Sequence, residues 1–329
     1  MRTMNRRSAL KNLRAGLFVA SGVSLTGCVS AGNDVLSSGS TETICIAVIS
    51  DTHIRRSSRD ELTDLTDQKH RYEEFVTAMN TDVRPDFVVH LGDLIDGRSP
   101  DNDPYCSEDT AVHRISKGKR LIHDRLSMPT YTVMGNHEYK GPNWDRERIR
   151  RAINDQWTRR SDTWYCIDRK GVRFLFLNTS CPVTNHRHHA MPAEEFAWLY
   201  DILEDTDRPL VAFMHVPATQ GCGDRYDQFK REDEVRRLLS SDENPNVITG
   251  IFGHSHHSDS WNRLRSQHDE YGTMYYHTSN IHEWMGDSSQ IPWAVLKIDL
   301  QRDRFRFSAG AGVTDSGEYR TTWIQSIAN

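Results

Sequence analysis

Five short clusters of residues that could bind metal ions or move protons occur along the chain, each directly after a short apolar run. They combine aspartate, asparagine and histidine with glycine, and they are Ser50–His53, Gly92–Asp93, Gly135–Glu138, His215 and Gly253–His256. Histidine is frequent overall, with 16 residues among 329. One such cluster is commonplace at average composition, but five in series after five apolar runs are not. The clusters therefore define the candidate site.

The residue types favour first-row metal ions in a catalytic role. Carboxylate, amide and imidazole ligands without a thiolate suit Mn, Fe, Zn or Co. A carboxylate such as that of Asp93 can bridge two ions about 3.5–4 Å apart, and such a pair brings the pKa of a bound water near neutrality. His254 and His256 are two residues apart on an extended turn, so both rings can point the same way and reach neighbouring ions. The pattern predicts a two-metal site.

Short buried strands must carry these clusters, because the preceding runs are brief and rich in β-branched residues. Strands are expected at 43–50, 86–90, 130–134, 210–214, 247–252 and 272–279, hairpins at 163–178 and 294–309, helices at 66–79 and 192–203, and an amphipathic stretch at 226–240. Alternating strands and helices favour parallel pairing, and the hairpins favour antiparallel additions. Ligands bind beyond the carboxyl ends of strands in open α/β sheets, so all five clusters should converge on one edge.

The series of motifs resembles the calcineurin-like metallophosphoesterase superfamily over about 45–257. The resemblance is carried by Asp51-x-His53, Gly92-Asp93, Gly135-Asn136-His137-Glu138, His215 and Gly253-His254-x-His256. It implies an α/β fold in which a sandwich of two mixed β-sheets is flanked by helices. It also implies two divalent or trivalent first-row ions, one held by Asp51, His53 and His256, the other by Asn136, His215 and His254, with Asp93 as the bridge. His137 would bind no metal and would protonate the leaving alkoxide or steady the attacked phosphate.

The resemblance implies a dinuclear-metal phosphoesterase whose nucleophile is a metal-bridging hydroxide and whose substrate is a small phosphodiester or phosphomonoester. The bimetal core handles both ester types, so the sequence does not separate them. The alternative is a non-catalytic envelope lipoprotein that binds a phosphorylated ligand or a metal. His137 discriminates between the two, because a binding protein has no use for a general acid beside its ligands.

The N-terminal residues resemble an export signal. Residues 2–14 carry five basic residues, a weakly apolar run follows at 15–25, and no acidic residue precedes Asp34. This layout is typical of a secretory signal, and Arg6-Arg7 resembles the twin-arginine type, although Ala9 departs from it. Leu25–Cys28 resembles a lipoprotein box, which would make Cys28 the lipidated first residue. An amphipathic helix belonging to the fold is the alternative, and three glycines in 16–27 argue against it.

The expected organisation is an export signal at 1–27, the lipidated Cys28 with a flexible tether at 28–43, and one metallophosphoesterase domain at 44–329. The protein is expected in the periplasm or cell envelope, attached to the membrane only through the lipid. The signal holds five of the 41 basic residues and none of the 46 acidic ones, so the remaining chain has a formal net charge of −10. That charge argues against a nucleic-acid surface or an anionic membrane as partner.

Several segments allow two interpretations. The polar stretch 97–125 is either an insertion over the site or a plain solvated excursion, and together with 181–192 it is expected to set specificity. The basic segment 186–189 either lines the substrate mouth or forms a solvated loop, and the loop is preferred. His277 and His282 are candidates for contacts with phosphate or with the metal ligands. Besides Cys28 the chain has five cysteines, none in a CxxC, so at most two disulfides can form. Export by the twin-arginine route would let the domain fold in a reducing cytoplasm, so the fold is not expected to depend on disulfides.

Overall fold

The computed structural model describes residues 29–30, 43–54, 66–98, 105–153, 162–184, 188–217, 228–229, 232–240, 243–254, 266–268, 274–277, 293–309 and 322–326. The predicted export signal with Cys28, most of the predicted tether, His256 and His282 lie outside these residues. Within the described part, no helix is both long enough and apolar enough to span a bilayer.

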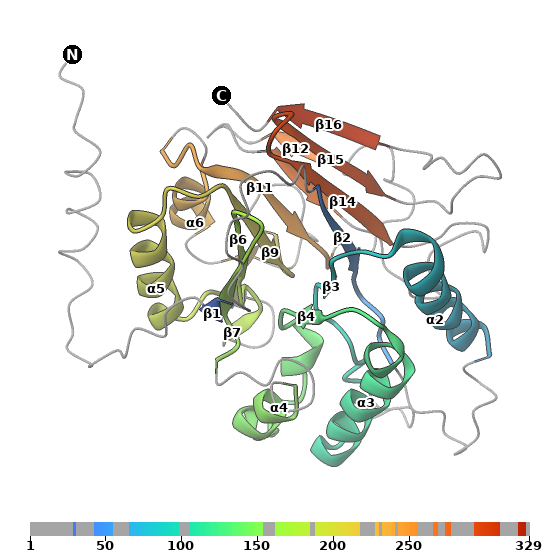
Figure 1. Cartoon of the computed structure of the whole chain (residues 1–329). Helices are drawn as coiled ribbons and strands as arrows, with labels where there is room; N and C mark the ends of the chain where they lie inside the picture. The colour runs from blue at the N-terminus through green and yellow to red at the C-terminus, as the bar shows by residue number, and fades with distance from the viewer. Residues whose placement is uncertain are drawn as a thin grey trace.

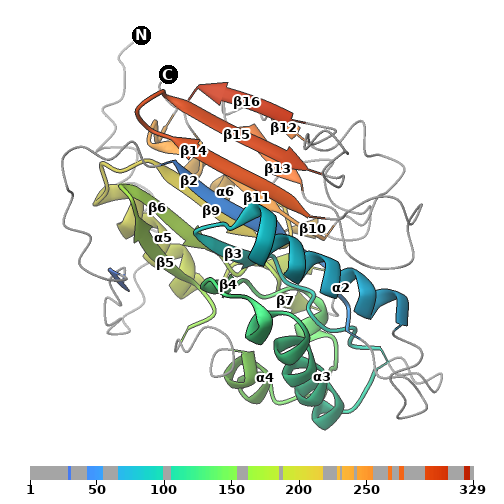
Figure 2. The ribbon, with the colours of Figure 1, turned by 45° about the vertical axis from the view of Figure 1, so that its right-hand side comes forward.

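Two large mixed sheets form the body of the molecule (Figures 1 and 2). The first has the strand order β16-β15-β14-β2-β3-β4, with bounds Thr322–Ser326, Arg304–Ala309, Ala294–Asp299, Ile44–Ile49, Phe87–His90 and Thr130–Thr132. The second has the order β1-β5-β6-β9-β11-β13-β12, with bounds Val29–Ser30, Tyr165–Arg169, Val172–Phe176, Leu210–Met214, Val247–Phe252, Met274–His277 and Ser266–His268. A small third sheet has the order β10-β8-β7, with bounds Gln228–Phe229, His188–Ala190 and Cys181–Thr184.

The side chains of the buried strands alternate between the two faces of each sheet, and this explains why the sheets stack. In β2, Ile46 and Val48 join Phe174 of β6 and Phe213 of β9 in one core between the sheets, whereas Ala47 of β2 belongs to the core on the opposite face. Successive side chains of a strand point to opposite faces, so an unbroken apolar run needs cover on both sides.

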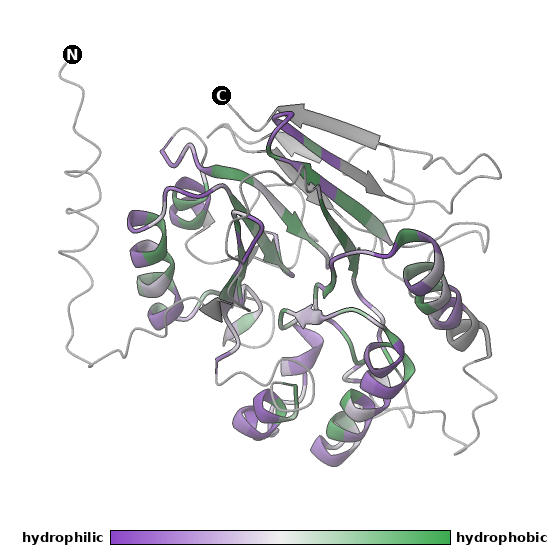
Figure 3. Ribbon diagram, in the orientation of Figure 1, coloured by the Kyte–Doolittle hydropathy of each residue, from purple (hydrophilic) through white to green (hydrophobic). Residues whose placement is uncertain are grey.

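Helices supply that cover, with their apolar stripes inward (Figure 3). Helices α2 to α4 pack on the outer face of the six-stranded sheet, and α5 and α6 pack on the seven-stranded sheet. Their bounds are Thr66–Ala78, Glu108–Leu121, Arg146–Ile153, Ala193–Glu204 and Glu232–Leu238. A π-helical turn extends α2 over Met79–Val83, and two 3₁₀ turns occupy His123–Arg125 and His137–Tyr139. The predicted sandwich of two mixed sheets flanked by helices is confirmed.

The interpretations of 97–125 need correction. About half of this polar stretch is helix α3, whose first turn is capped by Ser107 through a hydrogen bond from the Thr110 backbone N–H. Ala111 and Ile115 are fully buried in the core beneath the six-stranded sheet. Most residues of the stretch are polar because only a narrow stripe of this helix faces the core. It is part of the fold, neither an insertion nor a solvated excursion.

Two smaller features also differ from expectation. Val29–Ser30, within the predicted tether, pair in parallel with Ile167 and Asp168 of β5 as strand β1. Cys166 is disulfide-bonded, whereas Cys45, Cys106 and Cys181 are free thiols.

Candidate metal centre

The carboxyl ends of the central strands meet at one edge, as the sequence predicts. Strands β2, β3 and β4 are parallel to one another, and so are β6, β9 and β11 in the other sheet. The loops that follow β2 and β3 are joined directly: the Asp51 N–H donates to the Gly92 carbonyl at 3.1 Å and the His53 N–H to the Asp93 carbonyl at 2.9 Å. Two of the predicted clusters are therefore held in fixed register.

Four of the predicted ligands have left-handed backbone. The φ angles are 55° at Asp51, 43° at His53, 51° at Asp93 and 71° at His254. This region is costly for residues with a Cβ, and such outliers gather where a function requires a particular side-chain direction. Aspartate and histidine adopt this region more often than most residues with a Cβ, and the packed loops fix it here. Arg84, Lys170 and Asp303 also have positive φ and lie away from these loops, so the backbone agrees with a functional site without marking one by itself.

Glycines allow the loops to pass within contact distance of one another. A Cβ on Gly135 would lie 2.1 Å from the Asp93 backbone N and 2.3 Å from Asp93 Oδ1. A Cβ on Gly253 would lie 1.9 Å from Ser50 Oγ. Both positions therefore exclude any side chain, which is the physical reason for the glycine in each motif.

The first group of donor atoms comes from β3, β4, β9 and β11. Asn136 Oδ1 lies 3.0 Å from His215 Nε2 and 2.9 Å from His254 Nδ1, and these two ring nitrogens are 3.2 Å apart. His215 Nε2 is also 3.3 Å from Asp93 Oδ1. The other nitrogen of His215 lies 2.8 Å from the Leu91 carbonyl, an arrangement typical of metal-binding imidazoles, which donate their second N–H to a backbone oxygen.

The second group comes from the loops after β2 and β3. His53 Nε2 lies 3.6 Å from Asp93 Oδ2 and 3.8 Å from Asp51 Oδ1. All three residues are at most 2% exposed. Asp93 Oδ2 is buried and accepts no hydrogen bond from the described residues. A buried carboxylate oxygen without a donor is costly unless a cation neutralises it.

Asp93 belongs to both groups. The ligand atoms of Asp51, His53 and Asp93 lie within 4.8 Å of one another, and the same holds for Asp93, His215 and His254. Carboxylate, amide and imidazole atoms are ligand types that first-row metal ions accept, so both groups are candidate metal-binding sites. The structure thus brings together every described residue of the predicted ligand set. Their roles as ligands stay predictions, and His256 lies outside the described residues.

The pKa values reflect this crowding of charges. Burial would raise the pKa of Asp93, but the imidazoles of His215, His137 and His53 hold it well below its ordinary value. For His215, burial acts to lower the pKa, and the carboxylates of Asp93, Asp51 and Glu138 outweigh it and raise the pKa to about 9. A proton on His215 thus supplies the positive charge that the carboxylates demand when no metal is bound.

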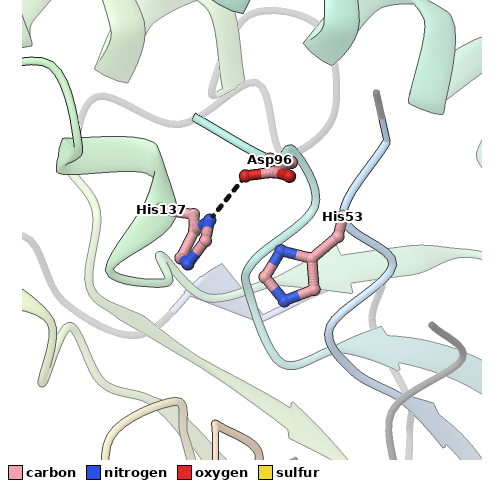
Figure 4. Close-up of side chains that lie close together, drawn as sticks. All are labelled: His53, Asp96 and His137. Atoms are coloured by element: carbon pink, nitrogen blue, oxygen red, sulfur yellow. Dashed lines mark ion pairs between the residues drawn. The ribbon is translucent and has the colours of Figure 1, made fainter. Parts of the chain in front are cut away.

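His137 lies beside the two groups and is oriented by a carboxylate that the sequence reasoning missed. Its Nδ1 is 3.4 Å from Asp96 Oδ1, and its ring packs edge-on against His53 with centroids 4.4 Å apart (Figure 4). His137 Nε2 points the other way and is 3.9 Å from Asp93 Oδ2. The imidazole thus has the Asp96 carboxylate at ion-pair distance from one nitrogen, without a hydrogen bond, and the centre near the other nitrogen. The spacing Gly92-Asp93-x-x-Asp96 was the available signal, because both aspartates follow one strand.

Glu138 is a second residue whose role the sequence did not reveal. Its Oε2 accepts hydrogen bonds from the N–H groups of Asp93 and Gly135, at 3.0 and 2.8 Å, and its Oε1 accepts one from Ile95 at 3.1 Å. Burial and the Asp93 charge nevertheless raise its pKa to about 7. The side chain joins the loops after β3 and β4 and so sets the position of Asp93 relative to Asn136.

The remaining histidine predictions have mixed outcomes. His189 is 1% exposed, and its ring centroid lies 6.0 Å from that of His254, so the preferred solvated-loop interpretation is wrong for this residue. The third sheet folds this part of the chain against the site. His277 ends β13, next to Phe252 in register. Its predicted contacts, and those of His282, lie beyond what the structure describes.

A family model described as calcineurin-like phosphoesterase matches residues 45–258. This chain belongs to the calcineurin-like phosphoesterase family. The sequence-based prediction of the family is confirmed, with nearly the same bounds. A curated relative, the cAMP/cGMP dual specificity phosphodiesterase of Mycobacterium tuberculosis (strain CDC 1551 / Oshkosh), is 30% identical to this chain over 179 residues. That match covers 51% of this chain and 48% of the relative, so it spans about half of each.

Solved structures show the same fold at low identity. A dimetal phosphatase from Danio rerio superposes with a TM-score of 0.61 at 15% identity, covering 87% of this chain and 99% of that one. The purple acid phosphatase PPD1 from yellow lupin seeds has a TM-score of 0.56 at 13% identity, covering 88% and 54%. GAP50, the anchor in the inner membrane complex of Plasmodium, has a TM-score of 0.54 at 15% identity, covering 87% and 90%. These identities establish the fold alone.

Proposed function

We propose that this calcineurin-like phosphoesterase is an exported two-metal hydrolase of phosphodiesters. The observation that carries the proposal is Asp93, a buried carboxylate whose two oxygens face two separate groups of ligand atoms. One carboxylate that serves two cation sites is the arrangement that two-metal phosphoester hydrolysis requires. A single structural ion would leave one of the two groups without a purpose.

The residues divide into two sets around that bridge. Asp51, His53 and His256 would hold one ion, and Asn136, His215 and His254 the other. Bound there, first-row ions supply Lewis acidity toward phosphoryl oxygens and bring the pKa of a bound water near neutrality. The protein contributes the burial of Asp51, Asp93 and His215, which keeps competing water away from the carboxylates and strengthens their attraction for cations.

His137 would supply the proton that the leaving oxygen needs. Burial lowers the pKa of His137, and the carboxylates of Asp93 and Asp96 oppose this shift. Asp96 at Nδ1 also favours the tautomer that carries a proton on that nitrogen. His137 Nε2 faces the centre and is the atom that would donate to a departing alkoxide. This proton transfer is typically worth about 10²–10⁴-fold in rate.

A small phosphodiester is the substrate class we propose, with cyclic nucleotides first among those to test. The support comes from the mycobacterial relative, whose name specifies cAMP and cGMP. Phosphomonoesters stay as the second class, because two of the structural neighbours are phosphatases by name and the same metal centre serves both ester types.

A substrate panel tests the proposal. Bis-p-nitrophenyl phosphate, p-nitrophenyl phosphate, cyclic nucleotides and glycerophosphodiesters should be assayed with Mn, Zn, Fe and Mg. We expect hydrolysis of at least one diester, its loss in excess chelator and its recovery with Mn or another first-row ion. Calcium should restore less, because it prefers six to eight oxygen ligands and this site offers four imidazoles. Full activity in chelator after dialysis would refute the two-metal hypothesis.

Export and lipid attachment are part of the proposal and are supported by the sequence alone. The basic head, the apolar run and Leu25–Cys28 lie outside the described residues. Intact-mass measurement of the protein from a bacterial envelope fraction should show loss of 1–27 and a lipid on Cys28. Cys28→Ala should release the protein from the membrane fraction, and recovery of unmodified full-length chain would contradict the proposal.

The alternative of a non-catalytic binding protein has one observation in its favour. GAP50 shares the fold and is described as an anchor. The pairing of His137 with Asp96 beside the metal groups argues for catalysis, because binding needs no oriented proton donor. If the metal-loaded protein binds phosphate tightly yet hydrolyses no ester in the panel, the binding function is the correct one.

A further inference from the structure

Lys140 lies at the metal-facing end of His137. It directly follows the 3₁₀ turn His137–Tyr139 and is half-buried. Its Nζ is 3.4 Å from His137 Nε2, the ring nitrogen that faces Asp93. The ammonium is therefore beside the atom that would donate the proton, and away from the Asp96 end of the ring.

The stem of Lys140 occupies a position that the neighbouring loop makes available. A Cβ on Gly97 would lie 2.4 Å from Lys140 Cβ and 3.0 Å from its Cγ. Any side chain at position 97 would displace the lysine. Gly97 directly follows Asp96, so one loop both orients His137 through its carboxylate and leaves room for the lysine stem. Packing against Gly97 thus fixes the base of the Lys140 side chain, and the ammonium lies beside His137 Nε2.

We propose that Lys140 binds a non-bridging oxygen of the phosphoryl group, which makes it a substrate-binding residue of the reaction proposed above. In the structure Lys140 Nζ is within hydrogen-bond distance of His137 Nε2 and donates to it, and a phosphoryl oxygen between the two atoms can take over this donor at about 2.8–2.9 Å, the usual length of a charge-assisted hydrogen bond.

This inference rests on the proposed function for its substrate class, and it assigns to Lys140 a preference for more highly charged phosphates. A monoester dianion and inorganic phosphate place more charge on the oxygens than a diester monoanion does. Loss of the ammonium should therefore weaken monoester and phosphate binding more than diester binding. A general loss of structure would weaken the binding of all these compounds alike, so the larger effect on monoester and phosphate distinguishes the inference from misfolding.

The test compares Lys140→Met, Lys140→Arg and the matched control Lys117→Met, a half-buried lysine on α3. Each metal-loaded protein is assayed on bis-p-nitrophenyl phosphate and p-nitrophenyl phosphate, and inorganic phosphate binding is measured by calorimetry. Elemental analysis checks the metal content. For Lys140→Met we expect kcat/KM on the monoester to fall about 10- to 100-fold, mostly through KM, because hydrogen bonds to charged groups have about that worth.

The Kd for phosphate should rise by a similar factor in Lys140→Met, with metal content unchanged. Lys140→Arg should recover most of the affinity, and Lys117→Met should match the unsubstituted protein. An unchanged phosphate Kd in Lys140→Met overturns the inference. So does an equal fall in kcat for both Lys140 variants with phosphate binding intact, because Lys140 would then only orient His137. Inactivity of the unsubstituted protein on every ester would contradict the proposed function alone, since phosphate binding still tests Lys140.

Discussion

The carboxylate of Asp93 holds the site together at the scale of single residues. One oxygen accepts the His137 backbone N–H at 2.7 Å and lies 3.3 Å from His215, and the other faces His53. Asp93→Asn keeps the shape but removes the charge, so we expect both ions to bind weakly and most activity to be lost. Elemental analysis of the purified variant is the measurement, with the exposed Asp124→Asn as control. Two tightly bound ions per chain in Asp93→Asn would contradict the bridging role.

His137 separates an enzyme from a binding protein. An ester that expels an ordinary alkoxide needs a proton as the bond breaks, whereas an ester that expels p-nitrophenolate hardly does. His137→Ala should therefore lose about 10²–10⁴-fold on an alkyl ester and clearly less on a nitrophenyl ester, with both metals retained. The same ranking of substrates is expected for Asp96→Asn, at smaller size, because the imidazole loses its orienting partner. Equal losses on both esters would instead assign His137 to charge stabilisation.

At the scale of elements, Glu138 joins the ends of β3 and β4. Its carboxylate accepts three backbone N–H groups. In Glu138→Gln the amide NH₂ must face at least one of these donors, and a buried unsatisfied donor costs about 1–3 kcal/mol. We expect the free energy of unfolding, measured with urea, to fall by about that amount, and metal affinity to fall with it. Glu204→Gln, at an exposed helix end, is the control. A variant as stable as the parent would show that the loops are held by other contacts.

Helix α3 supports the loops as well as the core. Ile115 is fully buried, and a Cβ on Gly118 would lie 2.6 Å from Ile54 and 2.8 Å from Leu94, which directly follow His53 and Asp93. Ile115→Ala should lower the free energy of unfolding by about 2–5 kcal/mol, the usual cost of emptying a core position. The exposed His113→Ala on the same helix should change it by less than about 0.5 kcal/mol. If both substitutions change the free energy of unfolding by a similarly small amount, α3 contributes little to the core and the interpretation as an insertion is correct.

For the whole molecule, we expect both the free energy of unfolding and the affinity for metal ions to depend on the protonation of His215. Its pKa is about 9 in the folded metal-free protein, above the ordinary 6.5. The stabilisation from its proton is therefore fully present below pH 6.5 and is lost as pH rises toward 9. A metal ion needs the neutral ring, so ion binding should strengthen over the same range. Urea unfolding in chelator and in Mn should show the two stabilities diverging with rising pH. A metal-free stability that rises across this range would contradict the assignment, and His215→Asn should remove the trend.

The sequence by itself determined the central strands, the order of the clusters and the family. The buried runs before Asp51, Asp93 and His215 are recognisable because a strand covered on both faces is continuously apolar, and that is a local property. The predicted ligand residues followed from the resemblance to the family, and their types and their places at strand ends agree with it. The polar stretch around α3 was misinterpreted, because one narrow apolar stripe is hard to distinguish from a solvated segment.

Only the tertiary structure decided which side chains meet. The contacts of Asp96 with His137, of Glu138 with the N–H groups of Asp93 and Ile95, and of Lys140 with Gly97 join residues on different loops. The left-handed backbone at the predicted ligands is likewise fixed by packing, although aspartate and histidine adopt it more readily than most residues with a Cβ. Composition and hydrophobic periodicity predict the secondary structure of each segment. The distances between side chains of different loops, such as Asp96 and His137, depend on how the two sheets stack, and no single segment of the sequence encodes that stacking.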